Sequence, residues 1–171
     1  MALEFWAGIA LYIAPMYIAN SSAMIFGGRT PLDLNRKWVD GKPIFGSGKT
    51  FKGTAIGVIS GTIVAFLINA AIPEITSLLT PEYVVLGFLL SFGAVAGDIV
   101  ASFFKRRNNI KQGTPVLFLD QLDFVFGAAV FAGVIYLPSL YEFLIIGIAT
   151  MVVHRVSNFV AFKLRIKKVP W

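Results

Sequence analysis

The hydrophobic positions of this chain are gathered in long stretches that are separated by shorter polar segments. A helix that crosses the hydrocarbon core of a bilayer needs about 20 mostly apolar residues. Because lipid offers the backbone no hydrogen-bond partners, such a stretch must be helical. Five stretches meet this requirement, and we predict a membrane-spanning helix in each: Leu3–Phe26, Gly53–Ile72, Glu82–Phe104, Phe118–Leu137 and Ser139–Phe162.

Composition supports an all-α integral membrane protein that forms a single polytopic domain over 1–171. Of the 171 residues 57% are hydrophobic and 14% are charged, and the mean hydropathy of +0.77 is typical of membrane proteins rather than soluble domains. Cysteine is absent, which excludes disulfides, thiolate metal sites and cysteine nucleophiles. The single histidine, His154, excludes a multi-histidine metal site within one chain.

The cations predict how the helices are oriented. All 15 Lys and Arg residues lie between the first two spans, directly after the third span, or near and beyond the end of the fifth. The positive-inside rule therefore places the N-terminus outside, the C-terminus in the cytoplasm, and cytoplasmic loops at about 27–52 and 105–117. We expect a multi-pass protein of the cell membrane whose active site faces the cytoplasm. Topology explains the basic pI without a nucleic-acid partner.

Several segments depart from the simple pattern. The acidic Glu4 and the length of the first apolar run are unlike a signal peptide, so we expect this segment to remain as a membrane helix. Pro15 and the polar Asn20-Ser21-Ser22 predict that the first helix kinks and unwinds before its end. The glycine- and proline-rich loop after it should be irregular, with a short helix around Leu32–Val39.

Three aspartates are the strongest sign of chemistry. Asp98 lies seven residues before Lys105, which places it about 10 Å inside the membrane boundary on the third span. Asp120 and Asp123 share one face at the start of the fourth span. Ionised groups at this depth usually mark a functional site, and three carboxylates are a ligand set for Mg²⁺. Spacing alone leaves a second interpretation equally open, in which the acids stabilise a helix N-terminus and pair with cations.

Two basic segments flank these acids. We predict that Lys105, Arg106 and Lys111 contact phosphate, as Arg and Lys do in polyphosphate sites, and Arg107 is a weaker candidate. The alternative is ordinary positive-inside anchoring. In the other segment, Gly46-Ser47-Gly48-Lys49-Thr50 is not a Walker A motif.

Gly48, Lys49 and Lys52 nevertheless form a turn at a helix start that favours anions, although a flexible loop with topogenic lysines explains them equally well. Asn20 and Ser21 either line the same cavity or satisfy the backbone at the kink. A third pattern, Gly53, Gly57 and Gly61, predicts close packing of the second span against a neighbouring helix.

The order of these motifs along nearly the whole chain resembles the CDP-archaeol synthase family, archaeal enzymes related to bacterial CDP-diacylglycerol synthases. Gln112 and Gln121 stand where the bacterial signature has an acid and an arginine. The residues that carry the resemblance are Phe26-Gly27-Gly28-Arg29-Thr30-Pro31-Leu32-Asp33, Asp40-Gly41-Lys42-Pro43, Gly46–Gly53, Gly97-Asp98, Ser102–Arg106, Lys111 and Asp120-Gln121-Leu122-Asp123.

The resemblance implies transfer of the cytidylyl group of CTP to the phosphate of an isoprenoid ether lipid, with release of pyrophosphate. It implies that Asp98, Asp120 and Asp123 hold Mg²⁺ and are catalytic together with Lys105, Arg106 and Lys111. The expected substrate-binding residues are Asn20, Ser21, Gly48, Lys49, Lys52 and Ser102. The alternatives are another membrane lipid-phosphate transferase or a small ion-coupled transporter. Oligomeric state stays open, with a homo-oligomer as one option.

Overall fold

A computed structural model describes residues 2–163 and 165 of the chain. Within these residues there is no strand, and β-structure is limited to two isolated bridges, Pro31 with Thr50 and Lys37 with Pro43. The fold is therefore all-helical, as predicted. The helices are α1 (Ala2–Ile25), α2 (Phe51–Ala71), α3 (Pro73–Thr76), α4 (Tyr83–Arg107), α5 (Leu119–Ala132) and α6 (Leu140–Lys163).

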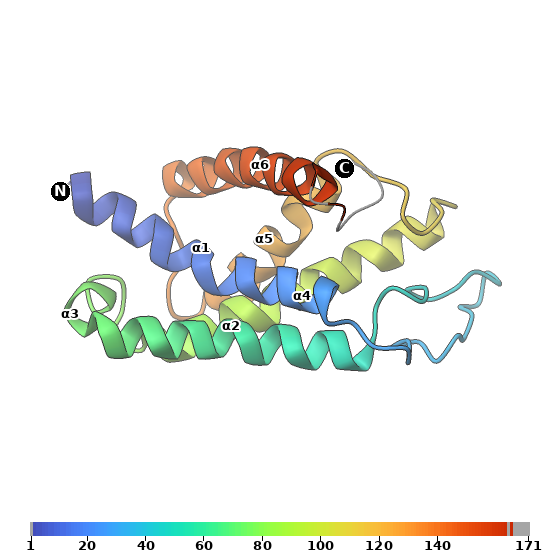
Figure 1. The fold of residues 1–171 in the computed structure, drawn as a ribbon, viewed down its shortest axis with the longest axis horizontal. Helices are drawn as coiled ribbons and strands as arrows, with labels where there is room; N and C mark the ends of the chain where they lie inside the picture. The colour runs from blue at the N-terminus through green and yellow to red at the C-terminus, as the bar shows by residue number, and fades with distance from the viewer. Residues whose placement is uncertain (1, 164, 166–171) are drawn as a thin grey trace.

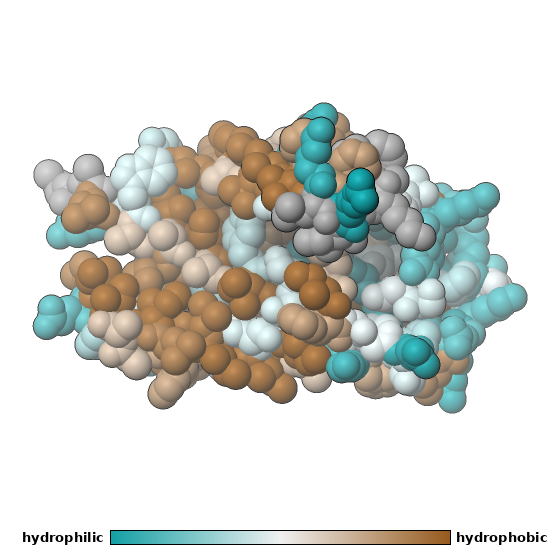
Figure 2. Space-filling model, viewed as in Figure 1, coloured by the Kyte–Doolittle hydropathy of each residue, from teal (hydrophilic) through white to brown (hydrophobic). Residues whose placement is uncertain are grey.

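The two longest loops meet at one end of the molecule. Figure 1 shows the α1–α2 loop (residues 26–50) and the α4–α5 loop (residues 108–118) at the same end, with α3 and its turns at the other. Figure 2 shows apolar side chains covering the helices and hydrophilic ones gathered over the two loops. The predicted loops therefore lie together, next to an apolar helical body suited to lipid.

Among the described residues four helices are long and apolar enough to cross a membrane, namely Leu3–Ile25, Phe51–Ala71, Tyr83–Arg107 and Leu140–Val160. They match four of the five predicted spans within a few residues. The remaining prediction, Phe118–Leu137, is only partly helical, because α5 has 14 residues. At 1.5 Å per residue it is about 21 Å long, less than the roughly 30 Å hydrocarbon core. The structure thus supports four full spans and a shorter fifth helix.

Glycine contacts hold α2 against its neighbours, as the sequence pattern predicted. Gly53, Gly57 and Gly61 are buried along one face of α2. A Cβ atom on Gly57 would lie 2.8 Å from the carbonyl oxygen of Ala19, and one on Gly61 would lie 2.5 Å from that of Pro15. Since real Cβ contacts are longer, only glycine permits this approach of α2 to α1.

The first helix does not unwind as predicted. It is α-helical from Ala2 to Ile25, through Pro15 and through Asn20. Proline lacks the N–H that would bond the carbonyl of residue 11, four positions earlier. The Tyr83 hydroxyl, on α4, donates to that Leu11 oxygen at 2.8 Å. A neighbouring helix therefore satisfies the freed carbonyl, and the polar residues after Pro15 are not needed for that purpose.

The predicted short helix around Leu32–Val39 is also wrong. This segment is a series of turns, with positive φ angles at Leu34 (50°) and Asn35 (59°) that no α-helix contains. The ends of the α1–α2 loop are instead paired, since Leu32 N–H donates to Lys49 O at 2.7 Å. The loop is a folded element rather than an irregular connection.

Candidate active site

Backbone contact between α4 and α5 positions the predicted carboxylates. A Cβ atom on Gly97 would lie 2.9 Å from the Cα of Gly127, and one on Gly93 would lie 2.8 Å from the Cα of Ala128. We refer to these residues as the α4–α5 contact. Because Asp98 follows Gly97 directly, the contact brings Asp98 close to Asp123. Asp123 lies within electrostatic range of both Asp98 and Asp120, so the three acids are neighbours.

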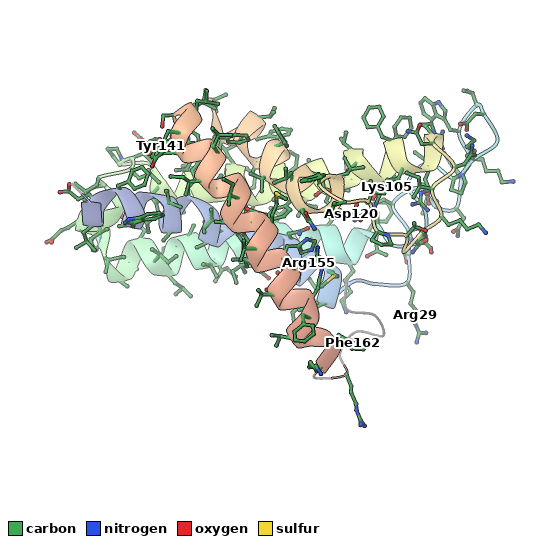
Figure 3. The ribbon with its side chains drawn as sticks, turned by 90° about the horizontal axis from the view of Figure 1, so that it is seen from above. Arg29, Lys105, Asp120, Tyr141, Arg155 and Phe162 are labelled. Atoms are coloured by element: carbon green, nitrogen blue, oxygen red, sulfur yellow. The ribbon has the colours of Figure 1, made fainter. Side chains whose placement is uncertain are left out.

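Two lysines compensate the acids. Lys49 Nζ forms an ion pair with Asp98 Oδ2, and Lys105 Nζ forms one with Asp120 Oδ1. Figure 3 shows Lys105 and Asp120 next to each other where the helices meet the loops. Lys49 comes from the α1–α2 loop, 49 positions before Asp98 in sequence. Tertiary folding therefore places a cation from each basic segment on a carboxylate, and all four side chains are partly buried.

The carboxylates have the donor chemistry for a hard divalent cation. Their remaining contacts are few: Val116 N–H donates to Asp120 Oδ2 at 3.0 Å, and Phe124 N–H donates to Asp123 Oδ1 at 2.7 Å. In the described part of the chain no three His, Asp or Glu side chains lie close enough together to hold a metal ion. Oxygen donors of this kind suit Mg²⁺, which would share the carboxylates with the two lysines.

The glycine-rich turn faces a side-chain amide and a guanidinium. Ser47 Oγ donates to Gln112 Oε1 at 2.9 Å. A Cβ atom on Gly48 would lie 2.9 Å from Gln112 Nε2, and one on Gly46 would lie 3.9 Å from Arg106 Nη1. Arg106 Nε is buried without a hydrogen-bond partner among the described residues. The turn and Arg106 thus lie together, and Arg106 keeps a free donor that suits an anion.

The start of α2 is less available to an anion than the sequence suggested. Thr50 is its N-cap, and the Thr50 hydroxyl accepts from Gly53 N–H at 3.1 Å and from Gly28 N–H at 3.0 Å. Phe51 N–H donates to Thr30 O at 3.2 Å. Since these donors are already used, a phosphate near this turn would rely on the lysine and arginine side chains more than on the helix terminus.

Asp33 folds the middle of the α1–α2 loop. It is only 5% exposed, and its carboxylate accepts N–H groups from Asn35 and Phe45 at 3.0 Å and from Gly46 at 2.9 Å. Burial raises the pKa of the Asp33 carboxyl, but these hydrogen bonds outweigh burial and hold the pKa below its ordinary value. Asp33 therefore stays ionised and fixes the turn that carries Gly46.

The other predicted site residues lie at the same end with weaker connections. Ser102 is buried on α4, one turn after Asp98 and on the same face. Lys52 is exposed in the first turn of α2, and its side chain packs over Gly28. Lys111 is exposed on the α4–α5 loop. Asn20 is half-buried and Ser21 is exposed on α1, and neither forms a hydrogen bond with the site among the described contacts.

An apolar groove that the sequence did not predict reaches the acids. It has a volume of about 750 Å³ and lies between α4 and α5. Its walls include Phe104, Leu122, Phe126 and Val130, and of the lining residues that the structure describes Asp123 alone can carry a charge. The groove thus joins a hydrocarbon-like surface to the carboxylate cluster.

Sequence reasoning noted Asp33 and Thr50 within the family motifs but assigned neither a role in the site. Thr50 carries a recognisable signal, because a hydroxyl residue directly before a long apolar run is typical of an N-cap. Asp33 carries no such signal, since its partners Phe45 and Gly46 are more than ten positions away.

Known proteins resemble this chain over almost its whole length. The family model described as CarS-like, CDP-archaeol synthase, matches residues 4–171. The CDP-archaeol synthase of Methanocaldococcus jannaschii is 46% identical over 169 residues, covering 94% of each chain. That of Thermococcus gammatolerans is 44% identical over 167 residues, covering 98% of this chain and 96% of the relative.

A solved structure described as "Structural insight into an intramembrane enzyme for archaeal membrane lipids biosynthesis" also superimposes on this fold. Its TM-score is 0.79 at 31% identity, over 87% of this chain and 91% of that one. The resemblance seen in the sequence motifs is confirmed over almost the entire length. The chain belongs to the CDP-archaeol synthase family.

Proposed function

We propose that this chain transfers the cytidylyl group of CTP to the phosphate of an unsaturated archaeal ether lipid, giving CDP-archaeol and pyrophosphate. Family membership supports the reaction. The observation that carries the proposal is the meeting of two surfaces at Asp123. On one side lie the two lysine–aspartate pairs, and on the other lies the apolar groove. A reaction between a water-soluble nucleotide and a lipid needs such a boundary.

The reaction asks the protein for positioning and charge compensation rather than for a nucleophile. An oxygen of the lipid phosphate attacks the α-phosphorus of CTP, a new P–O bond forms, and the bond to the β-phosphate oxygen breaks as pyrophosphate leaves. The lipid phosphate is ionised at neutral pH, so no general base is required. Lys49, Lys105 and Arg106 hold the triphosphate and offset its charge, with Lys52 and Lys111 at the rim.

Asp98, Asp120 and Asp123 would hold Mg²⁺, whose charge, when bound, neutralises phosphate oxygens and stabilises the departing pyrophosphate. Ser102 lies one turn from Asp98 and supports the same wall of the site. The groove between α4 and α5 takes an isoprenoid chain, with the lipid phosphate at Asp123. Since the cations gather at this end, we place the site on the cytoplasmic side of the cell membrane.

A reconstituted assay tests the proposal. Purified protein in lipid nanodiscs is given CTP, Mg²⁺ and 2,3-di-O-geranylgeranylglyceryl phosphate, and pyrophosphate release and the CDP-lipid are measured. We expect Asp120→Asn and Asp123→Asn each to lower turnover at least about 100-fold, because removing charge-stabilising groups costs several kcal/mol in the transition state. Glu74→Gln, an acid at the opposite end of the molecule, is the matched control and should be unchanged.

Other outcomes would separate the alternatives. Full activity in both aspartate variants would contradict the metal assignment. Equal turnover with ATP and UTP would contradict CTP as the nucleotide. Ion flux in liposomes without nucleotide turnover would indicate the transporter, and transfer of a group other than cytidylyl would indicate a different lipid-phosphate transferase. Family membership favours the cytidylyltransferase over both.

A further inference from the structure

The tip of the α1–α2 loop, residues 37–43, is fastened to the last turn of α4. Arg107 Nη1 forms an ion pair with Asp40 Oδ1 at 3.0 Å, and Arg107 Nη2 donates to the carbonyl oxygen of Pro43. In the opposite direction, Lys42 Nζ donates to the carbonyl oxygen of Arg107 at 2.6 Å. A planar guanidinium that bonds two separate acceptors fixes orientation as well as distance.

Aromatic contacts reinforce this attachment. The Arg107 guanidinium carbon lies 4.8 Å from the centre of the Phe103 ring, one helical turn earlier on α4. Trp38 and Phe45, both from the α1–α2 loop, pack on the same ring with centroid separations of 5.4 and 6.5 Å. The Phe103 ring is thus the surface on which the loop packs, and the Arg107 guanidinium covers one face of that ring.

Arg106 and Arg107 are therefore used differently although they are neighbours. Arg106 lies beside Gly46 and has an unpartnered Nε among the described residues. Both terminal nitrogens of Arg107 already bond the α1–α2 loop, and its side chain is only 17% exposed. The Nε of Arg107, like that of Arg106, is buried without a hydrogen-bond partner among the described residues, so the contrast lies in the terminal nitrogens. The two terminal nitrogens of Arg107 are committed to protein acceptors and are not offered to a phosphate.

Contacts within the α1–α2 loop connect its tip to the site. Asp33 bonds the N–H groups of Phe45 and Gly46, which links the tip to the glycine-rich turn. Lys49 comes directly after Gly48 of that turn and forms an ion pair with Asp98. Displacement of the tip would therefore move the turn and Lys49 together.

We propose that Arg107 is a positioning residue, which holds the α1–α2 loop on α4 so that Lys49 and the glycine-rich turn stay over Asp98 and Arg106. Its effect on kinetics rests on the proposed cytidylyl transfer, whereas its effect on the loop does not. The two effects can be measured separately, so failure of one is distinguishable from failure of the other.

Hydrogen exchange tests the structural effect. We expect Arg107→Ala in nanodiscs to speed amide exchange in residues 33–48 by about tenfold, since an ion pair, a hydrogen bond and a cation–π contact are lost, and to leave the middle of α2 unchanged. Arg29→Ala is the matched control, because Arg29 is an exposed arginine on the same loop that points away from Lys105 and Asp120 in Figure 3. Unchanged exchange in Arg107→Ala overturns the proposal.

Kinetics tests the positioning effect. We expect Arg107→Ala to raise the KM for CTP about tenfold with the KM for the lipid unchanged, and Arg107→Lys to recover part of the loss, since lysine keeps the Asp40 pair but not the fork. Asp40→Ala should have a smaller effect in the same direction, because Arg107 keeps its contacts with Pro43 and Phe103, and the double variant should be no worse than Arg107→Ala. A tenfold loss confined to kcat, or faster exchange with an unchanged KM for CTP, overturns the positioning role.

If the wild-type protein turns over no CTP, the proposed reaction fails while the exchange experiment still decides whether Arg107 holds the loop. Additive losses in the double variant would show that Arg107 does not act through Asp40, and would also overturn the proposal.

Discussion

The α4–α5 contact and the α1–α2 loop both deliver charged groups to the same site, but different forces hold them. At the α4–α5 contact, Gly97 and Gly127 let two helix backbones touch within the apolar body, and no charge is involved. The α1–α2 loop is held by a buried carboxylate, an ion pair and an aromatic platform at the polar end of the molecule.

This difference indicates which part of the site is rigid and which part can move. Close backbone packing in the apolar body tolerates little displacement, so we expect the acids on α4 and α5 to keep their relative positions. Polar contacts at the loop exchange with water and ions at modest cost. We infer that the carboxylates form the fixed part of the site and that Lys49 belongs to the part that adjusts when a nucleotide binds.

The largest effect should come from breaking the α4–α5 contact. In Gly97→Ala the new Cβ would meet backbone atoms of α5 at less than 3 Å, which forces the helices apart. We expect a loss of about 2–4 kcal/mol in unfolding free energy, together with the loss of most turnover. Thermal unfolding in detergent and the nanodisc assay measure the two quantities.

Gly147→Ala is the matched control for this substitution. Its Cβ would meet only the Leu122 Cδ2 atom, at 3.9 Å, which is an ordinary contact. The change in stability should stay within about 0.5 kcal/mol. Equal destabilisation by the two substitutions would show that the α4–α5 contact has no special role.

A smaller effect should follow removal of the Asp33 charge. Asp33→Asn weakens the acceptors for Phe45 and Gly46 N–H, and we expect the α1–α2 loop to lose about 1–3 kcal/mol, read as faster amide exchange of residues 33–48 at pH 7. Amide exchange at the α4–α5 contact should stay as slow as in the wild type. An equal loss of amide-exchange protection in the α1–α2 loop and at the α4–α5 contact would show that the two regions are not independent.

The stability difference between the wild type and Asp33→Asn should depend on pH with a definite sign. The folded pKa of Asp33 is lowered, so its stabilising contribution is complete above the ordinary aspartate pKa of about 3.9. The contribution is lost as pH falls through the lower folded value. The stability gap between the wild type and Asp33→Asn should therefore be constant near neutral pH and shrink below about pH 3.9, as measured by unfolding in detergent.

The smallest effect should come from salt. Raising ionic strength from about 0.1 to 1 M shortens the Debye length from about 10 to 3 Å, which weakens the partly exposed Arg107–Asp40 pair by less than about 1 kcal/mol. Exchange in the α1–α2 loop should rise by less than about fivefold, and exchange at the α4–α5 contact should not change. Equal acceleration in both regions would remove the distinction between them.

Sequence patterns predicted the helical class, four of the spans and the glycine face of α2. Long apolar runs leave no other choice of structure in lipid, so these predictions depend on local composition alone. The predicted span Phe118–Leu137 is only partly helical and the predicted helix near Leu32–Val39 is wrong, because end points and turns are decided by hydrogen bonds that composition does not reveal. Unwinding of α1 failed because Tyr83, from another helix, satisfies Leu11.

By itself, the sequence determined the helical class and identified the carboxylates in apolar segments beside clustered cations as candidates for phosphate chemistry. Only the tertiary structure decided their partners. It joined Lys49 to Asp98 and Lys105 to Asp120, opened an apolar groove at Asp123, and committed Arg107 rather than Arg106 to the α1–α2 loop. The physical reason is that charge type is a property of each residue, whereas pairing depends on how closely helices pack and where loops return.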